Sequence, residues 1–334
     1  MTRVSAYAAP EPGGILAPFD YDLGPLAPDE VDIAVAHCGI CHSDLSMIDN
    51  NWRSSRYPLV PGHEVIGRIA RAGSGVRHLA EGDLVGLGWH AGYCLTCAEC
   101  LGGHHHTCAQ AQPTIRGRHG GFADLVRAQA ASVLRLPDGL DPASAGPLLC
   151  GGITVFHPID AHVRPTDRVA VVGIGGLGHL ALQFLRAWGC EVTAFTTTPQ
   201  KADEARRLGA HDVLDTRDPK ALNAARGRFN MILSTVNVPL DWNRYASALA
   251  PRGRLHLAGV VMDPLSVAPG HLQGNERSIG ASPVGAPATM ARMLDFAARH
   301  RIRPVTEHFP LAEVNTALDH LRAGKTRYRV VLDL

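Results

Sequence analysis

The sequence predicts an α/β protein in which a mostly β domain precedes a doubly wound parallel sheet. The chain has 334 residues, more than one core usually holds, so two domains are expected. Short β-like runs rich in Gly and Pro fill the chain up to Cys150. Beyond Cys150, apolar strands alternate with helical patterns. This alternation indicates a parallel sheet covered by helices.

Composition excludes several classes of protein. Hydrophobic residues make up 46% of the chain and charged residues 19%, so a large core is expected. The net charge is +1 and basic clusters are as short as RHRIR, which argues against nucleic-acid binding. No apolar run approaches the roughly 20 residues of a membrane span, and the first residues lack a signal-peptide core. We therefore expect a cytoplasmic protein, and its eight cysteines favour metal binding over disulfide formation.

The first domain is predicted to be rich in strands and loops. Apolar residues alternate with small or polar ones, and Gly, Pro and Asp punctuate the runs. Strands are expected at residues 31–40, 65–76 and 82–89.

The second domain is predicted to begin its βαβ pattern at residues 167–197. Leu177, Leu180, Ala181, Phe184, Leu185 and Trp188 recur there at helical spacing. Helices are also expected at 199–210 and 243–251, and strands at 211–216, 229–236, 253–261 and 277–284. After these come predicted helices at 289–300 and 311–324 and a final strand at 328–334. This tail either extends the second sheet or crosses back to the first domain.

Four cysteines stand close together in the stretch CLTCAECLGGHHHTC, at C-x2-C-x2-C-x7-C spacing. Four thiolates complete a tetrahedral zinc shell with no open position, which is the structural type of site. The alternatives are an iron–sulfur cluster and an unligated loop. We favour zinc. Residues 104–106, three histidines, could be alternative ligands, but four cysteines already fill the shell, so we expect the histidines to be exposed. The predicted ligands are Cys94, Cys97, Cys100 and Cys108.

A glycine-rich turn follows an expected strand and opens a helix in VAVVGIGGLGHLA. It fits G-x-G-x-x-G, in which glycines let a pyrophosphate approach backbone N–H groups at a helix N-terminus. The βαβ context makes this motif much stronger than it is alone. The alternative is a glycine turn with no ligand. The predicted cofactor-binding residues of the turn are Gly173, Gly175, Gly176, Leu177 and Gly178.

The end of the next strand distinguishes NADP from NAD. An NAD enzyme places Asp or Glu there, on the ribose 2′-hydroxyl, and this chain has Thr197. Thr196 and Thr198 add hydroxyl groups, and Lys201 adds a positive charge suited to a 2′-phosphate. We therefore predict NADP(H). The alternative is that the threonines only cap the following helix.

A second metal site is less certain from the residues alone. Two thiolates and an imidazole with one open position form an accepted catalytic zinc set. Cys41, His63 and Cys150 could supply it, but they lie far apart in the sequence. They could equally be small buried hydrophobic residues and a core histidine.

Six motifs occur in one order along the chain and carry a family resemblance. They are CGICHSDL, YPLVPGHEVIGR, the cysteine row, GPLLCGGITVF, GIGGLGHLA and KTRYRVVLDL. Together they resemble the zinc-dependent medium-chain alcohol dehydrogenases, in particular the cinnamyl-alcohol-dehydrogenase-like branch and its bacterial NADPH-dependent aldehyde reductases. The resemblance covers essentially the whole chain. It implies a GroES-like catalytic domain (1–151, with a structural zinc lobe at about 90–110), a Rossmann NADP-binding domain (152–285) and a segment completing the catalytic domain (286–334).

The resemblance also implies a ligand set for the catalytic zinc. Cys41, His63 and Cys150 would hold the ion, so that each chain binds two Zn²⁺ ions. Cys38 and Cys190 would then be packing residues.

Four residues around these ligands receive implied catalytic roles. Ser43 would pass a proton between the substrate oxygen and the cofactor ribose, and Asp44 would fix the tautomer of the ligand histidine. Glu64 would lie beside the metal. His42 would approach the cofactor pyrophosphate, unless it is a surface histidine. Relatives carry a relay histidine where this chain has Ser46, so the route of the proton stays open.

The remaining implied contacts concern the cofactor, the substrate and the partner. Pocket candidates are Trp52, Trp89 and Ile115, unless they are core residues. The implied reaction is the reversible reduction of aliphatic or aromatic aldehydes to primary alcohols by NADPH. The strand at 277–284 would pair two chains in a homodimer. Further cofactor contacts would come from Thr154, Thr235, Val236, Asn237, Gly259, Val260 and Arg329, the last unless it is an exposed arginine.

Overall fold

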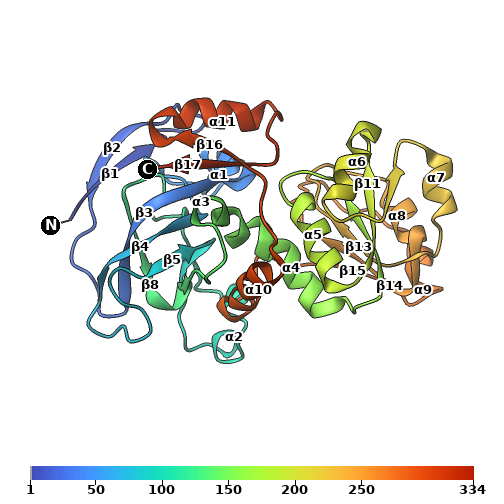
Figure 1. Cartoon of the computed structure of the whole chain (residues 1–334), viewed down its shortest axis with the longest axis horizontal. Coiled ribbons are helices and arrows are strands. Elements are labelled where there is room, and N and C mark those ends of the chain that lie inside the picture. The colour runs from blue at the N-terminus through green and yellow to red at the C-terminus, as the bar shows by residue number, and fades with distance from the viewer. Residues whose placement is uncertain (1) are drawn as a thin grey trace. The chain divides into compact units, whose positions relative to one another are not determined.

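A computed structural model describes residues 2–334 as two structural units. Unit 1 comprises the residues up to Ile153 together with Val284–Leu334, and unit 2 comprises Thr154–Pro283. The chain therefore leaves unit 1 once and returns to it at the end. In Figure 1, unit 1 holds the blue, cyan and red elements, and unit 2 holds the yellow and orange ones. No helix within residues 2–334 is long and apolar enough to cross a membrane.

Unit 1 is built on a mixed sheet in the order β16-β17-β3-β4-β5-β9, with β8 also paired to β3. Side chains at alternate positions of β3 enter the core, among them Val31 and Ile33, which are fully buried. The strands are β3 (Glu30–Ile40), β4 (Val65–Ala72), β5 (Leu84–Leu87), β8 (Leu125–Gln129), β9 (Val133–Arg135), β16 (Thr306–Pro310) and β17 (Arg329–Asp333).

Smaller elements complete unit 1. Two hairpin-like pairs are β1 (Arg3–Ala8) with β2 (Ala17–Asp22), and β6 (His90–Gly92) with β7 (Gln112–Pro113). The helices are α1 (His42–Ile48), α2 (Ala98–Leu101), α3 (Pro142–Ala145), α10 (Pro287–His300) and α11 (Val314–Arg322). Short 3₁₀ turns are η1 (His105–Thr107), η2 (Ala130–Ser132), η3 (Gly146–Leu149) and η5 (Leu311–Glu313).

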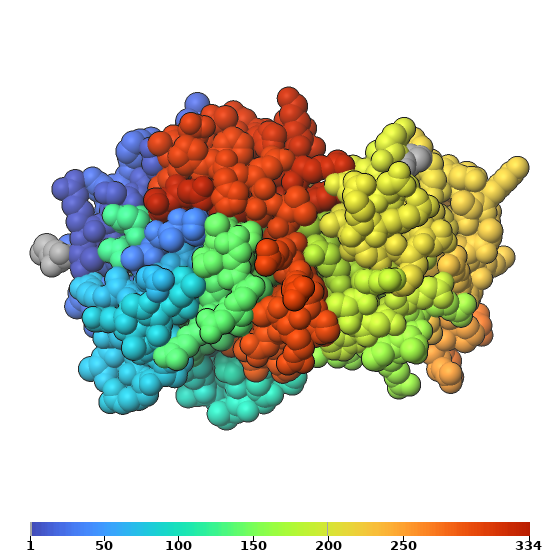
Figure 2. Space-filling view, in the orientation of Figure 1, coloured from blue at the N-terminus to red at the C-terminus, as the bar shows by residue number. Residues whose placement is uncertain are grey.

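The C-terminal tail crosses back to the first domain rather than extending the second sheet. β17 pairs antiparallel with β3 and parallel with β16. Arg322 in α11 also forms a bidentate ion pair with Asp49, the residue that ends α1. The space-filling view shows this last segment, in red, against the blue N-terminal part (Figure 2). β16 was not among the expected strands.

Unit 2 contains six parallel strands in the order β12-β11-β10-β13-β14-β15. Numbered within the unit, this is the order 3-2-1-4-5-6 of the doubly wound dinucleotide-binding fold. The strands are β10 (Arg168–Val172), β11 (Glu191–Thr196), β12 (Asp212–Asp215), β13 (Phe229–Ser234), β14 (Leu249–Leu257) and β15 (Ser278–Ala281). The predicted fold class, a mostly β domain and a Rossmann domain, is confirmed.

Helices connect these strands as the alternating pattern predicts. The helix α5 ends at Gly189, whose φ of 102° is the left-handed conformation that glycine adopts readily. Its apolar stripe is buried, and includes Leu180, Phe184 and Leu185. The helices are α4 (Gly151–His162), α5 (Gly178–Trp188), α6 (Ala202–Arg207), α7 (Pro219–Ala224), α8 (Trp242–Ala248) and α9 (Gly270–Gln273), with a 3₁₀ turn η4 (Pro199–Lys201) before α6.

Candidate functional site

Three chain segments of unit 1 meet at a buried cluster of potential metal ligands. Cys41 follows β3 and is the N-cap of α1, His63 and Glu64 directly precede β4, and Cys150 lies between η3 and α4. Pairing of β3 with β4 brings the first two segments together. One ligand atom from each of the four residues lies within 4.8 Å of all the others, and every one of these residues is buried.

The distances in this cluster fit a tetrahedral ion. Zn–S bonds of about 2.3 Å and Zn–N bonds of about 2.0 Å at tetrahedral angles place two sulfurs about 3.8 Å apart, and a sulfur and a nitrogen about 3.5 Å apart. The Sγ atoms of Cys41 and Cys150 are 3.8 Å apart. His63 Nε2 lies 3.3 Å from Cys150 Sγ. The donor set and its geometry therefore fit zinc.

Asp44 connects the two loops that carry Cys41 and His63 through one fully buried carboxylate. It accepts hydrogen bonds from the backbone N–H of Cys41 at 2.8 Å and of Gly62 at 2.9 Å. It also accepts from His63 Nδ1 at 3.0 Å. Because Nδ1 donates to this carboxylate, Nε2 is the ring atom left to bind a metal.

Electrostatics favour a thiolate at Cys41. The hydrogen bond with the Cys150 thiol holds the pKa of Cys41 well below its usual range. Burial opposes this effect, and the positive charge of Arg329 supports it. A thiolate is the form in which cysteine binds zinc, so the site is suited to a cation.

Glu64 and Arg329 form a buried ion pair beside the ligands, although 265 positions separate them in the sequence. Burial raises the pKa of Glu64, and Arg329 partly offsets that rise. Within the described part of the chain, Glu64 Oε2 and Arg329 Nε are buried without a hydrogen-bond partner. A Cβ atom at Gly39 would overlap the Glu64 carboxylate, so this close packing requires glycine there. The sequence pattern did not reveal this pair.

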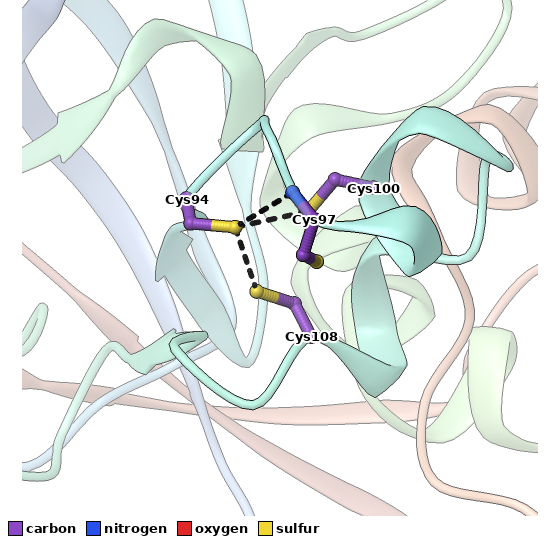
Figure 3. A group of neighbouring side chains, drawn as sticks. All are labelled: Cys94, Cys97, Cys100 and Cys108. Atoms are coloured by element: carbon purple, nitrogen blue, oxygen red, sulfur yellow. Dashed lines mark hydrogen bonds between the residues drawn. The ribbon is translucent and has the colours of Figure 1, made fainter.

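The four-cysteine lobe gathers its sulfurs as the spacing predicts. Figure 3 shows the side chains of Cys94, Cys97, Cys100 and Cys108 turned toward one another. The Sγ of Cys94 lies 3.5 Å from that of Cys108 and 3.9 Å from that of Cys100, close to the tetrahedral value of about 3.8 Å. All eight cysteines are free thiols, so no disulfide competes with metal binding.

The histidines between the last two cysteines are less exposed than we expected. Only His104 is exposed, whereas His105 and His106 are half-buried. They lie in or next to the 3₁₀ turn η1, and the ring of His105 packs edge-on against Tyr93 at 5.3 Å. The tight turn folds these rings onto the lobe, which accounts for the difference.

In the glycine turn, protein packing requires glycine at two positions but not at Gly175. Gly173 has a φ of 85°, and a Cβ atom there would overlap Val236. A Cβ atom at Gly178 would overlap the carbonyl oxygen of Gly173. At Gly175, which is exposed, it would meet no protein atom within 4 Å. Open space at a glycine in this position is what close approach of a ligand pyrophosphate needs. Gly176 and Leu177 lie half-buried between these glycines.

The other predicted cofactor residues of unit 2 lie at or after the ends of β11, β13 and β14, the strands on either side of β10 and the next one along. Thr197 is exposed immediately after β11, and Thr196 Oγ1 accepts from the backbone N–H of Thr198. Thr235 Oγ1 donates to Val172 and Gly173 carbonyl oxygens at 2.9 Å, so it secures the glycine turn. Five further predicted residues lie at the same edge of the sheet. They are Lys201, Val236, Asn237, Gly259 and Val260.

The other predicted residues vary in exposure. His42 is exposed at the start of α1, and the Ser43 hydroxyl lies 3.8 Å from Cys41 Sγ. Trp89 packs edge-on against the ring of His63 at 5.0 Å and against Trp52 at 5.9 Å. Of the remaining candidates, Thr154 is half-buried and Ile115 is fully buried. Cys38 and Cys190, which we expected to be packing residues, are also buried.

Known proteins of similar sequence identify the family. Residues 27–138 match the family described as the alcohol dehydrogenase GroES-like domain, and residues 176–299 match the zinc-binding dehydrogenase family. The chain is 58% identical to aldehyde reductase AdhA of Synechocystis over 98% of both proteins. The chain belongs to the zinc-binding alcohol dehydrogenases. It is also 37% identical to a probable cinnamyl alcohol dehydrogenase 9 of Oryza sativa, over 99% of this chain and 96% of that protein.

Solved structures place this alcohol dehydrogenase in the cinnamyl-alcohol-dehydrogenase-like branch. The Sorghum bicolor cinnamyl alcohol dehydrogenase SbCAD4 superposes with a TM-score of 0.95 at 34% identity, over 99% of this chain and 98% of that one. The cinnamyl alcohol dehydrogenase of Helicobacter pylori, described as complexed with NADP(H), gives a TM-score of 0.91 at 26% identity with the same coverage. The family resemblance of the sequence motifs is thereby confirmed, and the protein is an enzyme, an oxidoreductase of the alcohol dehydrogenase and aldehyde reductase type.

Proposed function

We propose that the protein is a zinc-dependent, NADPH-linked aldehyde reductase that converts a broad range of aliphatic or aromatic aldehydes to primary alcohols, and catalyses the reverse reaction. The buried cluster of Cys41, His63 and Cys150 carries this proposal, because its donor set and distances fit a catalytic zinc. The 58% identity with the Synechocystis aldehyde reductase supports an aldehyde as substrate.

Two zinc ions and NADP(H) are the cofactors that these residues would hold. Cys41, His63 and Cys150 would bind the catalytic ion, and the four-cysteine lobe would bind the structural one. When bound, zinc supplies Lewis-acid polarisation of the substrate oxygen, and NADPH supplies the hydride. The Helicobacter relative complexed with NADP(H) supports the choice of dinucleotide, as does the absence of an acid at Thr197.

The chain's own residues orient these groups and move the proton. Asp44 fixes the His63 ring, and the thiolate at Cys41 keeps the cluster suited to a cation. Ser43, half-buried next to Cys41, would pass the proton toward the substrate oxygen. Glu64, held by Arg329, contributes a carboxylate oxygen within reach of the ligand atoms.

We propose that the cofactor contacts follow the same family pattern. The glycine turn would bind the pyrophosphate, with His42 and Arg329 as further contacts from unit 1. Thr196, Thr197, Thr198 and Lys201 would bind the 2′-phosphate and its ribose. The remaining contacts would be Thr154, Thr235, Val236, Asn237, Gly259 and Val260.

The proposal is tested by measuring aldehyde reduction with NADPH and with NADH for a set of different aldehydes. We expect kcat/KM with NADPH to exceed that with NADH for short aliphatic, benzylic and cinnamyl aldehydes, and two zinc ions per chain in the active protein. Ser43→Ala should lower turnover about 10²-fold, and the neighbouring Ser46→Ala should lower it little. A preference for NADH, or full activity without zinc, would contradict the proposed function.

We further propose that unit 1 is the catalytic domain, unit 2 the cofactor domain, and that two chains pair along β15. This edge strand offers unpaired backbone groups to a second copy of the chain. Sedimentation of the zinc-loaded protein should show a dimer. A monomer at micromolar concentration would remove the pairing from the proposal and leave the reaction untouched.

A further inference from the structure

A cavity of about 310 Å³ lies among three helices of unit 2. Its lining comes from α7 and the turn after it (Leu222, Arg226), from α8 (Arg244, Ser247) and from α9 (His271). These helices lie side by side at one end of unit 2 (Figure 1). The cavity therefore belongs entirely to one unit, and no residue of the metal cluster lines it.

The cavity lies near the edge of the sheet opposite the glycine turn. Arg226 and Ser247 stand shortly before the first residues of β13 and β14, Phe229 and Leu249. The glycine turn, in contrast, follows the last residue of β10. All six strands are parallel, so their first residues share one edge and their last residues the other. A ligand in the cavity would thus be distinct from the dinucleotide.

The charges around the cavity are positive and poorly compensated. Two arginines and a histidine line it, with no carboxylate among the lining residues. Arg226 is exposed, and its side chain forms no ion pair or hydrogen bond within residues 2–334. Arg244 pairs with Asp241 through Nε at 3.0 Å, which leaves its terminal nitrogens. An anion would satisfy the guanidinium groups that remain.

Arg277 adds a third guanidinium next to this lining. Its terminal nitrogen donates to the carbonyl oxygen of His271 at 3.1 Å, and its Nε is buried without a hydrogen-bond partner. Burial lowers the pKa of Arg277, and the positive charge of Arg226 lowers it further. The guanidinium groups of Arg226 and Arg277 are thus close enough to repel each other, and an anion bound at Arg226 would relieve that repulsion.

Neutral donors complete the lining. Asn243 Oδ1 accepts from the backbone N–H of Ala268 at 2.8 Å, which leaves the Asn243 amide NH₂ as a donor. The Ser247 hydroxyl donates to the Asn243 carbonyl oxygen at 2.8 Å and lies 3.0 Å from His271 Nδ1. Because the hydroxyl is committed in this way, the serine and histidine do not form a nucleophilic pair. The residues that line the cavity are therefore suited to binding a ligand rather than to nucleophilic catalysis.

We propose that this cavity is a binding site for a phosphate group, either free or carried on a small organic body. Paired guanidinium groups and amide donors are the groups that recognise phosphate oxygens. A volume of about 310 Å³ is at the lower end of ligand pockets, so it admits a small phosphomonoester rather than a dinucleotide. Leu222 supplies the apolar wall for such a body.

Calorimetric titration of the full-length, zinc-loaded protein tests this proposal. Inorganic phosphate and glycerol 3-phosphate are titrated separately in a phosphate-free buffer, with and without saturating NADP⁺, and glycerol serves as the uncharged control. We expect both phosphates to bind with NADP⁺ present, and glycerol not to bind. Tighter binding of glycerol 3-phosphate would assign the site to an organic phosphate, and equal binding would assign it to phosphate itself.

Two variants separate the cavity from general surface charge. Arg226→Gln removes an exposed guanidinium with no partner, so we expect it to fold normally and to weaken phosphate binding at least ten-fold. Arg207→Gln removes an exposed arginine of the same unit outside the cavity and should bind as the parent does. Unchanged binding by Arg226→Gln, or binding abolished by NADP⁺, would overturn the proposal.

Discussion

Asp44 is the residue on which the geometry of the metal cluster depends most. Its two carboxylate oxygens accept three hydrogen bonds, from the ring of His63 and from the backbone of the two loops that carry Cys41 and His63. It is fully buried, so no water can replace a lost acceptor. One side chain therefore sets both the tautomer of the histidine and the distance between the loops.

We expect Asp44→Asn to lower zinc affinity at the catalytic site about 10- to 100-fold, because the amide would turn a donor toward an N–H group. Zinc content after dialysis against a weak chelator, together with turnover, measures the effect. Asp49→Asn is the matched control, since Asp49 ends the same helix but pairs with Arg322. Retention of both zinc ions and full turnover by Asp44→Asn would contradict the role assigned to Asp44.

A second residue-scale prediction concerns pH. His256 in β14 is 1% exposed, and burial together with the charges of Arg254, His162 and His157 lowers its pKa to about 3. Ser282 and Arg254 also hydrogen-bond its ring. Below about pH 6.5 the unfolded chain binds a proton that the folded chain does not, so stability falls as the pH falls toward 3.

The variant His256→Gln removes this proton uptake. Between pH 7 and pH 5, the parent should lose about 2 kcal/mol more of its free energy of unfolding than the variant does. Urea unfolding of the zinc-loaded proteins at both pH values measures the difference. The variant can be less stable at pH 7 without affecting the test, because only the pH dependence counts. Equal pH dependence in the two proteins would show that His256 does not carry the effect.

The sequence predicted some residues of the site better than others, for a physical reason. The four-cysteine lobe lies within one short stretch, so its spacing alone indicated a closed shell. Cys41 and Cys150 are 109 positions apart, and only the resemblance to a family joined them before the structure did. The ion pair of Glu64 with Arg329 escaped notice altogether, because it depends on the last strand returning to the first domain.

At the scale of the element, the four-cysteine lobe is held by few apolar contacts. Its small cluster consists of Tyr93, Cys100 and Cys108, with Cys94, Cys97 and Ala111 packed around them. An element with so little apolar surface to bury needs another source of folding free energy. Metal binding supplies it in this interpretation.

We therefore expect Cys97→Ser to bind one zinc ion per chain instead of two and to expose residues 94–108 to proteolysis. Metal analysis measures the zinc content, and limited proteolysis followed by mass spectrometry of the fragments measures cleavage within residues 94–108. Cys190→Ser is the control, because Cys190 is a buried cysteine of unit 2 that belongs to neither cluster. Two zinc ions in Cys97→Ser would contradict the assignment, as would visible absorption by an iron–sulfur cluster in the parent protein.

Element prediction succeeded where periodicity was strong, and it missed several strands of unit 1, among them β1, β2, β8 and β16. The Rossmann strands are short apolar runs between helical patterns, and each was expected near its observed position. The strand β16, TEHFP, contains one large apolar residue, and none of its five residues is buried. It forms only because β17 offers it hydrogen-bonding groups at the edge of the sheet. No local pattern could have indicated that pairing.

At the scale of the whole molecule, the last strand of the chain, β17, completes the sheet of unit 1. β17 lies between β3 and β16, and its residues Val330, Val331 and Leu332 are at most 1% exposed. Burial of three such side chains contributes about 5–9 kcal/mol, comparable to the total stability of an ordinary domain. Unit 2 is continuous from Thr154 to Pro283 and includes none of these contacts.

Deletion of residues 329–334 should therefore unfold unit 1 selectively. We expect loss of hydrogen-exchange protection in β3 and β4, loss of catalytic zinc and loss of turnover, while β10 and β13 of unit 2 stay protected. Deletion of Leu334 alone is the control, because that residue is 42% exposed and its loss leaves β17 intact. Protection of β3 after the longer deletion would mean that the sheet is stable without its returning strand. Simultaneous loss of protection in both units would mean that unit 2 depends on unit 1 for its stability.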